Sequence, residues 1–170
     1  MPSQYSGAAH LIMRISWIYS PHGRNFVKTM LRVASERSEV RVVNDQVGAP
    51  TSARRVAAIT AQILAQAQGA PVRFFRERGG AVHVGAAGEA TWRDVAIEVF
   101  RLARESGLPA PVGQVVPITT AEYRRAAQRP LNSRLDGSRL RDRFGLEIPH
   151  WKSDLAEQFD EIAAALASRS

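Results

Sequence analysis

The apolar residues of this chain fall into short runs separated by segments with a helical spacing. Residues 11–19 are almost continuously apolar, and shorter apolar runs follow at 40–43, 81–84 and 115–118. The nearly continuous run at 11–19 is typical of a strand buried on both faces of a parallel sheet, whereas the shorter runs, which contain Arg41 and His83, indicate short strands. The pattern therefore predicts four strands, the first of which is one continuous buried strand ending at the turn 20–23.

Between these runs the apolar residues recur every three or four positions, which is the spacing of one helix face. Three such segments follow a side chain that can cap a helix, namely Asn25, Thr51 or Ser52, and Thr91. The sequence Gln-Gly-Ala-Pro at 68–71 ends the second of these helices. Trp92 opens the apolar row of the third helix, so we expect it to face the core.

The C-terminal part contains shorter elements and then the clearest helix. A short helical turn is predicted after Thr119 or Thr120, up to the break at Pro130, and a short helix begins at Ser138. From Trp151 onward the apolar residues recur at spacings of 4, 4, 3 and 4, which indicates one long amphipathic helix. Because strands alternate with helices, the predicted fold class is α/β with some parallel sheet.

The length of 170 residues is compatible with a single domain, and the sequence shows neither an internal repeat nor a low-complexity linker. An open parallel sheet, however, usually has more strands than the four predicted here, and helices cover both of its faces. We therefore expect residues 1–170 to form one unit that belongs to something larger.

The composition excludes several kinds of chemistry. The chain has no cysteine, which excludes disulfides, thiolate zinc sites, iron–sulfur clusters and cysteine nucleophiles. It also has no apolar run of the ~20 residues that cross a membrane, and no signal segment opens it. We therefore expect a cytoplasmic protein with no membrane partner.

The net charge of +7 raises the question of nucleic-acid binding. Of the 23 basic residues only Lys28 and Lys152 are lysines, and the arginines are scattered along the chain. Their densest stretch, 124–143, contains Asp136 and Asp142 and has no aromatic stacking box or helix-turn-helix signature. We therefore expect no nucleic-acid partner; a small anion such as a nucleotide diphosphate suits arginine side chains equally well.

The common catalytic motifs are missing from the sequence. It contains no Gly-x-Gly-x-x-Gly, no Gly-x-x-x-x-Gly-Lys phosphate loop and no Gly-x-Ser-x-Gly turn. The four histidines lack metal-ligand spacing, and no tyrosine is followed by a lysine four residues later. The Gly-Ala-Ala-Gly segment at 85–88 is either a phosphate-binding turn or a tight turn between strand and helix. His22 lies either in a pocket or in a surface turn.

Three polar loops remain as candidates for a site, at residues 14–23, 44–52 and 128–136. The first two loops follow predicted strands. Because open α/β folds bind ligands at the carboxyl ends of their strands, both loops are expected to lie at such an edge. Within the first loop, Trp17 is either a core aromatic residue of a buried strand or a ring that stacks on a ligand.

These segments resemble, in order and spacing, the signatures of the dTDP-4-dehydrorhamnose reductase family, a group of extended short-chain dehydrogenases/reductases. The matching segments are Arg-Ile-Ser-Trp-Ile-Tyr at 14–19, Asn-Asp-Gln-Val-Gly-Ala-Pro-Thr at 44–51, Pro-Ile-Thr-Thr-Ala-Glu-Tyr at 117–123, Arg-Pro-Leu-Asn-Ser-Arg-Leu-Asp at 129–136 and Ile-Pro-His-Trp at 148–151. The resemblance extends over residues 11–166. It implies the C-terminal portion of such an enzyme, an incomplete Rossmann-type parallel sheet with a substrate-binding subdomain.

The family reduces the 4-keto group of dTDP-4-dehydro-rhamnose with NADPH or NADH and so produces dTDP-rhamnose for cell-envelope polysaccharide. The resemblance implies that Trp17 contacts the dTDP-sugar and that Ser16 and Trp17 lie beside the cofactor. It also implies that Pro50, Thr51 and Ser52 line the pocket next to the nicotinamide.

The resemblance leaves the third loop with two roles. Arg129, Asn132 and Arg134 are either ligands of the diphosphate or structural caps. Arg134 and Asp136 are also close enough in sequence to pair with each other at the surface. A Mg²⁺ ion at a dimer contact is a further possibility that the family raises.

The sequence departs from the family in one large respect. The N-terminal half of the family, with its glycine-rich loop, catalytic threonine and Tyr-x-x-x-Lys pair, is absent from residues 1–170. Gln128 also stands where the family often has arginine. No residue of this chain is therefore assigned a catalytic role, and we expect it to be inactive alone or to need an N-terminal partner chain.

Two other interpretations stay open. The chain is either a non-catalytic module that binds a nucleotide sugar or docks on another subunit, or a decayed remnant without a stable fold. An incomplete sheet exposes a strand edge and an apolar face. We therefore expect the purified chain to be marginally stable, oligomeric, for example a homodimer, or prone to aggregation.

Overall fold

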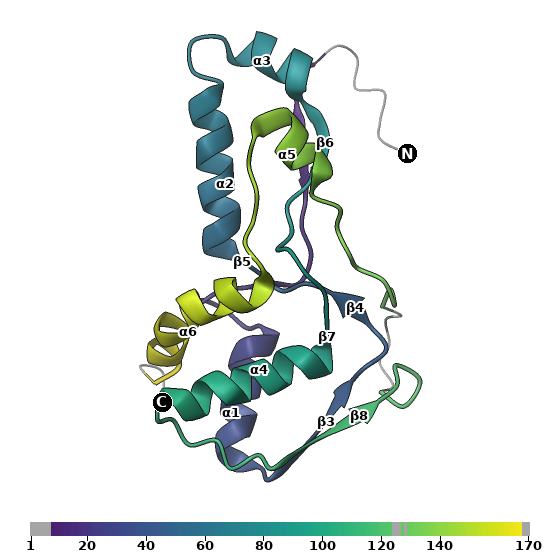
Figure 1. Ribbon diagram of the computed structural model, residues 1–170, viewed down its shortest axis with the longest axis vertical. Helices are drawn as coiled ribbons and strands as arrows, with labels where there is room; N and C mark the ends of the chain where they lie inside the picture. The colour runs from purple at the N-terminus through teal and green to yellow at the C-terminus, as the bar shows by residue number, and fades with distance from the viewer. Residues whose placement is uncertain (1–7, 124–126, 128, 168–170) are drawn as a thin grey trace.

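A computed structural model describes residues 8–123, 127 and 129–167 as an elongated α/β structure (Figure 1). Its helices are α1 (Phe26–Glu36), α2 (Ala53–Gln66), α3 (Pro71–Arg78), α4 (Trp92–Glu105), α5 (Ser138–Phe144) and α6 (Trp151–Ala167). Its strands are β1 (Leu11–Arg14), β2 (Ile18–Tyr19), β3 (Glu39–Val43), β4 (Val47–Gly48), β5 (Thr51–Ser52), β6 (Gly80–His83), β7 (Ala90–Thr91) and β8 (Gln114–Ile118).

The strands pair two by two. The pairs β1–β6, β2–β5 and β3–β8 are parallel, and β4–β7 is antiparallel. Figure 1 shows β1 and β6 among α2, α3 and α5 at one end, and β3 and β8 near α1 and α4 at the other. Parallel pairs between strands separated by helices confirm the predicted α/β class with parallel sheet.

The prediction of one continuous buried strand over residues 11–19 is wrong. The strand stops at Arg14, and pairing resumes only at Ile18 with a different partner strand. Trp17 has a φ of 50°, a left-handed conformation that turns the chain away from the strand direction. Ile12 and Ile15 are 40% and 48% exposed, so this segment is not buried on both faces within the described part of the chain.

The helix starts follow from capping side chains. Asn25 accepts a hydrogen bond from the backbone N–H of Lys28, at 3.1 Å, and so caps α1. Of the two candidates before α2 it is Ser52 that caps, through the N–H of Arg55. Thr91 and Asp94 form a reciprocal capping box at the start of α4. Each cap satisfies backbone N–H groups that the first turn of a helix leaves free.

Helix α3 is an element that the sequence pattern did not predict. Pro71, which ended the preceding helix in the sequence analysis, occupies the first turn of α3, where the missing N–H costs nothing. The turn predicted after Thr119 is present as a single hydrogen-bonded turn, from the N–H of Tyr123 to the carbonyl of Thr119.

Helices α4 and α6 contribute several of the most deeply buried residues of the core. Val95, Val99 and Phe100 of α4 are almost completely buried, as are Leu155 and Phe159 of α6. Helix α6 packs on β5, α1 and α4, and thereby joins elements from the whole length of the chain. None of the helices in the described ranges is long and apolar enough to span a membrane.

Candidate functional site

The three polar loops converge in the structure. The backbone N–H of Val47 donates to the carbonyl of Leu131, and the N–H of Ser133 donates to the carbonyl of Val47, both at 2.8 Å. The N–H of Thr51 donates to the carbonyl of Trp17 at 3.2 Å. The second loop is therefore joined to both of the others by backbone hydrogen bonds, which fix their relative positions.

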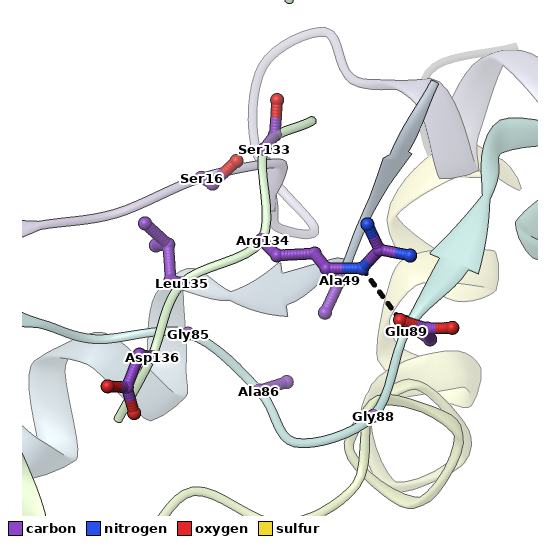
Figure 2. A pocket seen from close by; sticks show the side chains of 10 residues that line it. All are labelled: Ser16, Ala49, Gly85, Ala86, Gly88, Glu89, Ser133, Arg134, Leu135 and Asp136. Carbon is purple, nitrogen blue, oxygen red and sulfur yellow. Dashed lines mark hydrogen bonds and ion pairs between the residues drawn. The ribbon is translucent and has the colours of Figure 1, made fainter. Parts of the chain in front are cut away.

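A small cavity of about 240 Å³ lies on one side of this junction (Figure 2). Its lining residues are Ser16, Ala49, Gly85, Ala86, Gly88, Glu89, Ser133, Arg134, Leu135 and Asp136. All three loops contribute to this lining. The Gly-Ala-Ala-Gly segment contributes too, although its Ala87 N–H donates to the carbonyl of Pro149 and its Ala86 N–H to Thr51. Those two donors are thus used within the protein.

A larger cavity of about 670 Å³ lies on the other side of the junction. Phe26, Met30, Val42, Val43 and Trp92 give it an apolar surface. Its polar lining residues are Thr29, Arg41, Gln46, Thr120, Tyr123 and Arg129. This volume lies within the range of about 300–1,000 Å³ that is typical of small-molecule sites.

The second and third loops separate the two cavities. Gln46 lines the large cavity and Ala49 the small one, and in the third loop Arg129 lines the large cavity and Arg134 the small one. The paired segments 46–49 and 129–134 thus form a wall with one cavity on each side. We call this the loop wall.

Trp17 lies against the loop wall rather than in either cavity. Its indole ring stacks on that of Trp92, with ring centroids 3.7 Å apart and 13° between the planes. Gly48 lies so close that a Cβ atom there would be 2.8 Å from Cε2 of Trp17. Trp17 is not among the residues that line the two cavities. Trp17 is partly buried, and its predicted contacts with the dTDP-sugar and the cofactor stay predictions.

Trp92 is a candidate site residue that the sequence analysis did not identify. It begins α4 and lines the large cavity, while its Nε1–H donates to Oε1 of Gln46 at 3.1 Å. Phe26 packs beside it, with ring centroids 4.6 Å apart. Its place in the apolar row predicted a core residue. The signal that separates it from that row is its position at the first residue of the helix, next to a loop.

A chain of hydrogen bonds holds Gln46 in turn. Its Nε2–H donates to the hydroxyl of Thr120 at 3.0 Å, and that hydroxyl donates to Asp45 at 2.6 Å. The backbone N–H of Thr120 also donates to this carboxylate. These bonds from Thr120 lower the pKa of Asp45 below its ordinary value. The orientation of Trp92 is thus tied to the turn that follows β8.

Pro50, Thr51 and Ser52 lie deeper than the cavity surfaces. Thr51 is completely buried, and its hydroxyl oxygen accepts a hydrogen bond from the N–H of Ala86 at 2.9 Å. Ser52 is 2% exposed and both caps α2 and donates to Asp154. Pro50 is buried as well. These three side chains support the wall of the small cavity from behind, and their predicted contact with a nicotinamide stays a prediction.

A buried carboxylate fixes this part of the site. Asp154 is fully buried and accepts hydrogen bonds from the hydroxyl of Tyr19, from the N–H and hydroxyl of Ser52, and from Nε of Arg55, at 2.9–3.1 Å. Arg55 also pairs with Glu157. Burial, reinforced by the charge of Asp154, raises the pKa of Tyr19 far above its ordinary value. The hydroxyl of Tyr19 therefore serves as a fixed donor.

The third loop shows the structural role at Asn132, whereas the predicted diphosphate contacts of Arg129, Asn132 and Arg134 stay a prediction. Asn132 accepts a hydrogen bond from the backbone N–H of Arg134 at 3.1 Å, which is a structural turn. Arg134 pairs with Glu89, at 2.6 Å between Nε and Oε2, and not with Asp136 (Figure 2). Asp136 instead accepts bonds from Ser138. Gln128 lies outside the described residues.

Two further candidates from the sequence are His22 and a metal site. His22 is exposed in a turn closed by Ser20. No group of three or more potential ligands that could hold a metal ion occurs in the ranges that the structure describes. The Mg²⁺ ion raised by the family resemblance therefore has no ligand set there.

Comparison with known proteins gives a family. Residues 4–164 match the model described as the RmlD substrate binding domain. The dTDP-4-dehydrorhamnose reductase of Escherichia coli K12 is 39% identical over 160 residues, which are 94% of this chain and 52% of that protein. The chain thus spans about half the length of the curated relatives that it matches.

Solved structures that resemble this chain come from the same family of enzymes. A dTDP-4-dehydrorhamnose reductase from Clostridium acetobutylicum is 34% identical, with a TM-score of 0.76 over 90% of this chain and 49% of that one. The enzyme from Bacillus anthracis, in complex with NADP, is 32% identical, with a TM-score of 0.75 over 89% of this chain and 48% of that one. Because the family model covers nearly the whole sequence, the chain belongs to the RmlD substrate-binding domain family, found in dTDP-4-dehydrorhamnose reductases.

Proposed function

We propose that this chain forms the nucleotide-sugar-binding part of a dTDP-4-dehydrorhamnose reductase, the enzyme that reduces the 4-keto group of dTDP-4-dehydro-rhamnose. The observation that carries the proposal is the loop wall, with the two cavities on its sides. The family signatures at 44–51 and 129–136 are separated in sequence but bonded together in the fold. The residues that make the family recognisable are therefore those that shape the cavities.

The large cavity suits the nucleoside. Trp92 and Phe26 offer aromatic surface, on which a flat base gains contact area at little conformational cost. Thr29, Gln46 and Thr120 add polar groups. A cavity of about 670 Å³ also has the size for a nucleoside.

The small cavity suits the hexose, and the two arginines suit the diphosphate between them. At about 240 Å³ the small cavity lies below the usual size of a whole ligand site, so it takes only part of a ligand. Ser16 and Ser133 give it hydroxyl groups for a sugar. Arg129 and Arg134 belong to one segment and line opposite cavities, so both can reach a diphosphate that crosses the loop wall.

The residues present do not form a complete site for NADPH or NADH. The sequence has no dinucleotide-binding glycine motif and no Tyr-x-x-x-Lys pair, and the small cavity is too small for a dinucleotide. Ser16 is the residue predicted at the cofactor that reaches a cavity. In this proposal the chain binds and orients the sugar nucleotide, and the hydride and proton donors come from an N-terminal segment or partner chain in the cytoplasm.

A second candidate function is a non-catalytic module that binds a nucleotide sugar or docks on another subunit. The two cavities support it, since a module that only binds a nucleotide sugar needs the same sugar-nucleotide site. Both candidates share the sugar-nucleotide site, and they differ in whether a reductase partner exists. Adding a separately produced dinucleotide-binding half distinguishes them, because turnover of dTDP-4-dehydro-rhamnose is expected only from a split reductase.

Calorimetric titration of the pure chain tests the shared site. We expect dTDP-rhamnose to bind and NADPH to show no binding, and we expect no oxidation of NADPH by the chain alone. Arg129→Gln is expected to weaken dTDP-rhamnose binding about tenfold, since a charge-assisted contact is lost. Arg76→Gln on α3, outside both cavities, is the matched control. Absence of dTDP-rhamnose binding would refute the proposal.

A further inference from the structure

Glu89 and Arg134 face each other at the small cavity (Figure 2). Nε of Arg134 lies 2.6 Å from Oε2 of Glu89, and the two side chains are 46% and 64% exposed. Ion pairs with this much exposure add little to the stability of a fold. Stability of the fold therefore does not explain why the carboxylate of Glu89 lies beside an arginine that is exposed enough to bind a phosphate.

Buried structure fixes the backbone on both sides of this pair. The carbonyl of Glu89 accepts a hydrogen bond from Nε1–H of Trp151, a residue that is 1% exposed. The N–H of Arg134 is held by Asn132, and that of the preceding Ser133 by Val47. The backbone positions from which the two charged side chains extend into the cavity are consequently fixed.

The ion pair occupies only one edge of the guanidinium group. It engages Nε, while the two terminal nitrogens of Arg134 have no hydrogen-bond partner among the residues that the structure describes. Those nitrogens carry four N–H donors whose fork geometry suits phosphate oxygens. Any phosphate that they bind comes close to the negative charge of Glu89.

We propose that Glu89 is a specificity-determining residue, which makes the site prefer a diphosphate esterified to a sugar over a free nucleoside diphosphate. This inference rests on the proposed function of the site. A free terminal phosphate carries a charge of about −1.5 to −2 at neutral pH, whereas the same phosphate in a nucleotide sugar is a diester with a single charge. The extra charge is repelled by Glu89, and specificity of this kind depends on a repulsive element as much as on attraction.

Such a preference has a chemical use. An enzyme that acts on a sugar nucleotide gains nothing from binding the nucleotide without its sugar. Arg134 alone would favour the more highly charged free nucleotide, because a guanidinium group attracts the larger negative charge more strongly. Glu89 reverses that bias while it leaves the terminal donors of Arg134 available.

The test compares dissociation constants for dTDP and dTDP-rhamnose, measured by calorimetry on the pure chain. Glu89→Gln is expected to tighten dTDP binding threefold to tenfold and to change dTDP-rhamnose binding less than twofold. Glu105→Gln, an exposed glutamate of α4 that is also paired with an arginine, is the control and should change neither. Thermal unfolding verifies that both variants are folded.

Ionic strength gives a second measurement that a structural role of Glu89 would not affect. Raising the salt concentration from about 0.01 M to 1 M shortens the Debye length from about 30 Å to 3 Å. The preference of the unsubstituted chain for dTDP-rhamnose should shrink accordingly, and that of the Glu89→Gln variant should change less. If the ratio of the dissociation constants for dTDP and dTDP-rhamnose is the same in Glu89→Gln as in the unsubstituted chain, this inference is wrong, while the proposed function of the site still stands. Binding of neither nucleotide to the unsubstituted chain overturns the proposed function, and this inference with it.

Discussion

Trp17 and Trp92 stack face to face, with their ring centroids 3.7 Å apart. One indole comes from the first loop and the other from the start of α4, so the contact connects the first loop to that helix. Because Nε1–H of Trp92 is fixed by Gln46, the pair has a defined orientation. Trp17 thus acts on the large cavity through the ring that lines it.

A double-mutant cycle measures this contact. Trp17→Leu, Trp92→Leu and the double variant are expected to show a coupling energy of about 0.5–1.5 kcal/mol in urea unfolding, since a stacked pair stabilises beyond its buried area. The same cycle between Trp92 and Phe74, which lies on α3 at the other end of the molecule (Figure 1), should give a coupling within about 0.5 kcal/mol of zero. Equal coupling in both cycles would contradict a specific stack.

Gly48 is required by the indole of Trp17. We expect Gly48→Ala to lower the free energy of unfolding by about 1–3 kcal/mol, because the new Cβ would lie 2.8 Å from Cε2 of that ring. Gly113→Ala is the control, since the nearest atom to its Cβ is 4.0 Å away. Urea unfolding of both variants checks the difference, and similar losses would show that the contact is not restrictive.

The raised pKa of Tyr19 makes the fold sensitive to alkali. Tyr19 stays protonated in the folded chain, whereas an unfolded tyrosine ionises near pH 10. The folded state therefore binds more protons above about pH 10, and its stability should fall there by up to about 1.4 kcal/mol per pH unit. Below pH 10 this contribution is constant. Tyr19→Phe should unfold with a smaller slope above pH 10, and an identical slope would contradict the prediction.

Asp154→Asn tests the buried carboxylate. An amide cannot accept all four hydrogen bonds, and it leaves Arg55 without its buried counter-charge. We expect a loss of about 3 kcal/mol, the lower end of the range for a broken buried ion pair, because a quarter of the Arg55 side chain is exposed. Asp160→Asn on the same helix should cost less than about 0.5 kcal/mol. Chemical denaturation of the two variants provides the comparison.

The exposed side of β1 predicts self-association. Ile12 is 40% exposed on a strand that pairs, within the described residues, only with β6. We expect the pure chain to form oligomers that Ile12→Lys reduces, since a charge on an edge strand opposes pairing. Ile97→Lys on α4, where the isoleucine is 38% exposed, serves as the control. A uniform monomer by light scattering would count against this expectation.

The sequence predicted those features that depend on local chemistry. Asn25, Ser52 and Thr91 cap helices as their side chains allow, and the apolar spacing of α6 corresponds to its buried face. The α/β class follows from the alternation of patterns. Each of these features is decided within a few residues, so spacing and residue type suffice to predict it.

Features set by contacts between distant segments could not be predicted in the same way. The left-handed backbone at Trp17 interrupts an apolar run that looks like one strand. The pattern of apolar residues does not indicate the φ angle of any one of them, so this break could not be predicted. The site role of Trp92 depends on a loop more than forty residues earlier, through Gln46. Arg134 likewise pairs with Glu89 rather than with its sequence neighbour. The rule that ligands bind at the carboxyl ends of strands brought the first two loops together in advance, and only the family resemblance added the third.

The hydrogen bonds that Asp154 accepts also determine when the site can form during synthesis of the chain. Ser52 and Tyr19 precede Asp154 by 102 and 135 residues. At about 5–20 residues per second, Ser52 waits roughly 5–20 s for its carboxylate partner. Until then the segments behind the small cavity lack the group that anchors them. The site is thus completed only after α6 has been synthesised, and a nascent chain without α6 should be a target for chaperones and proteases.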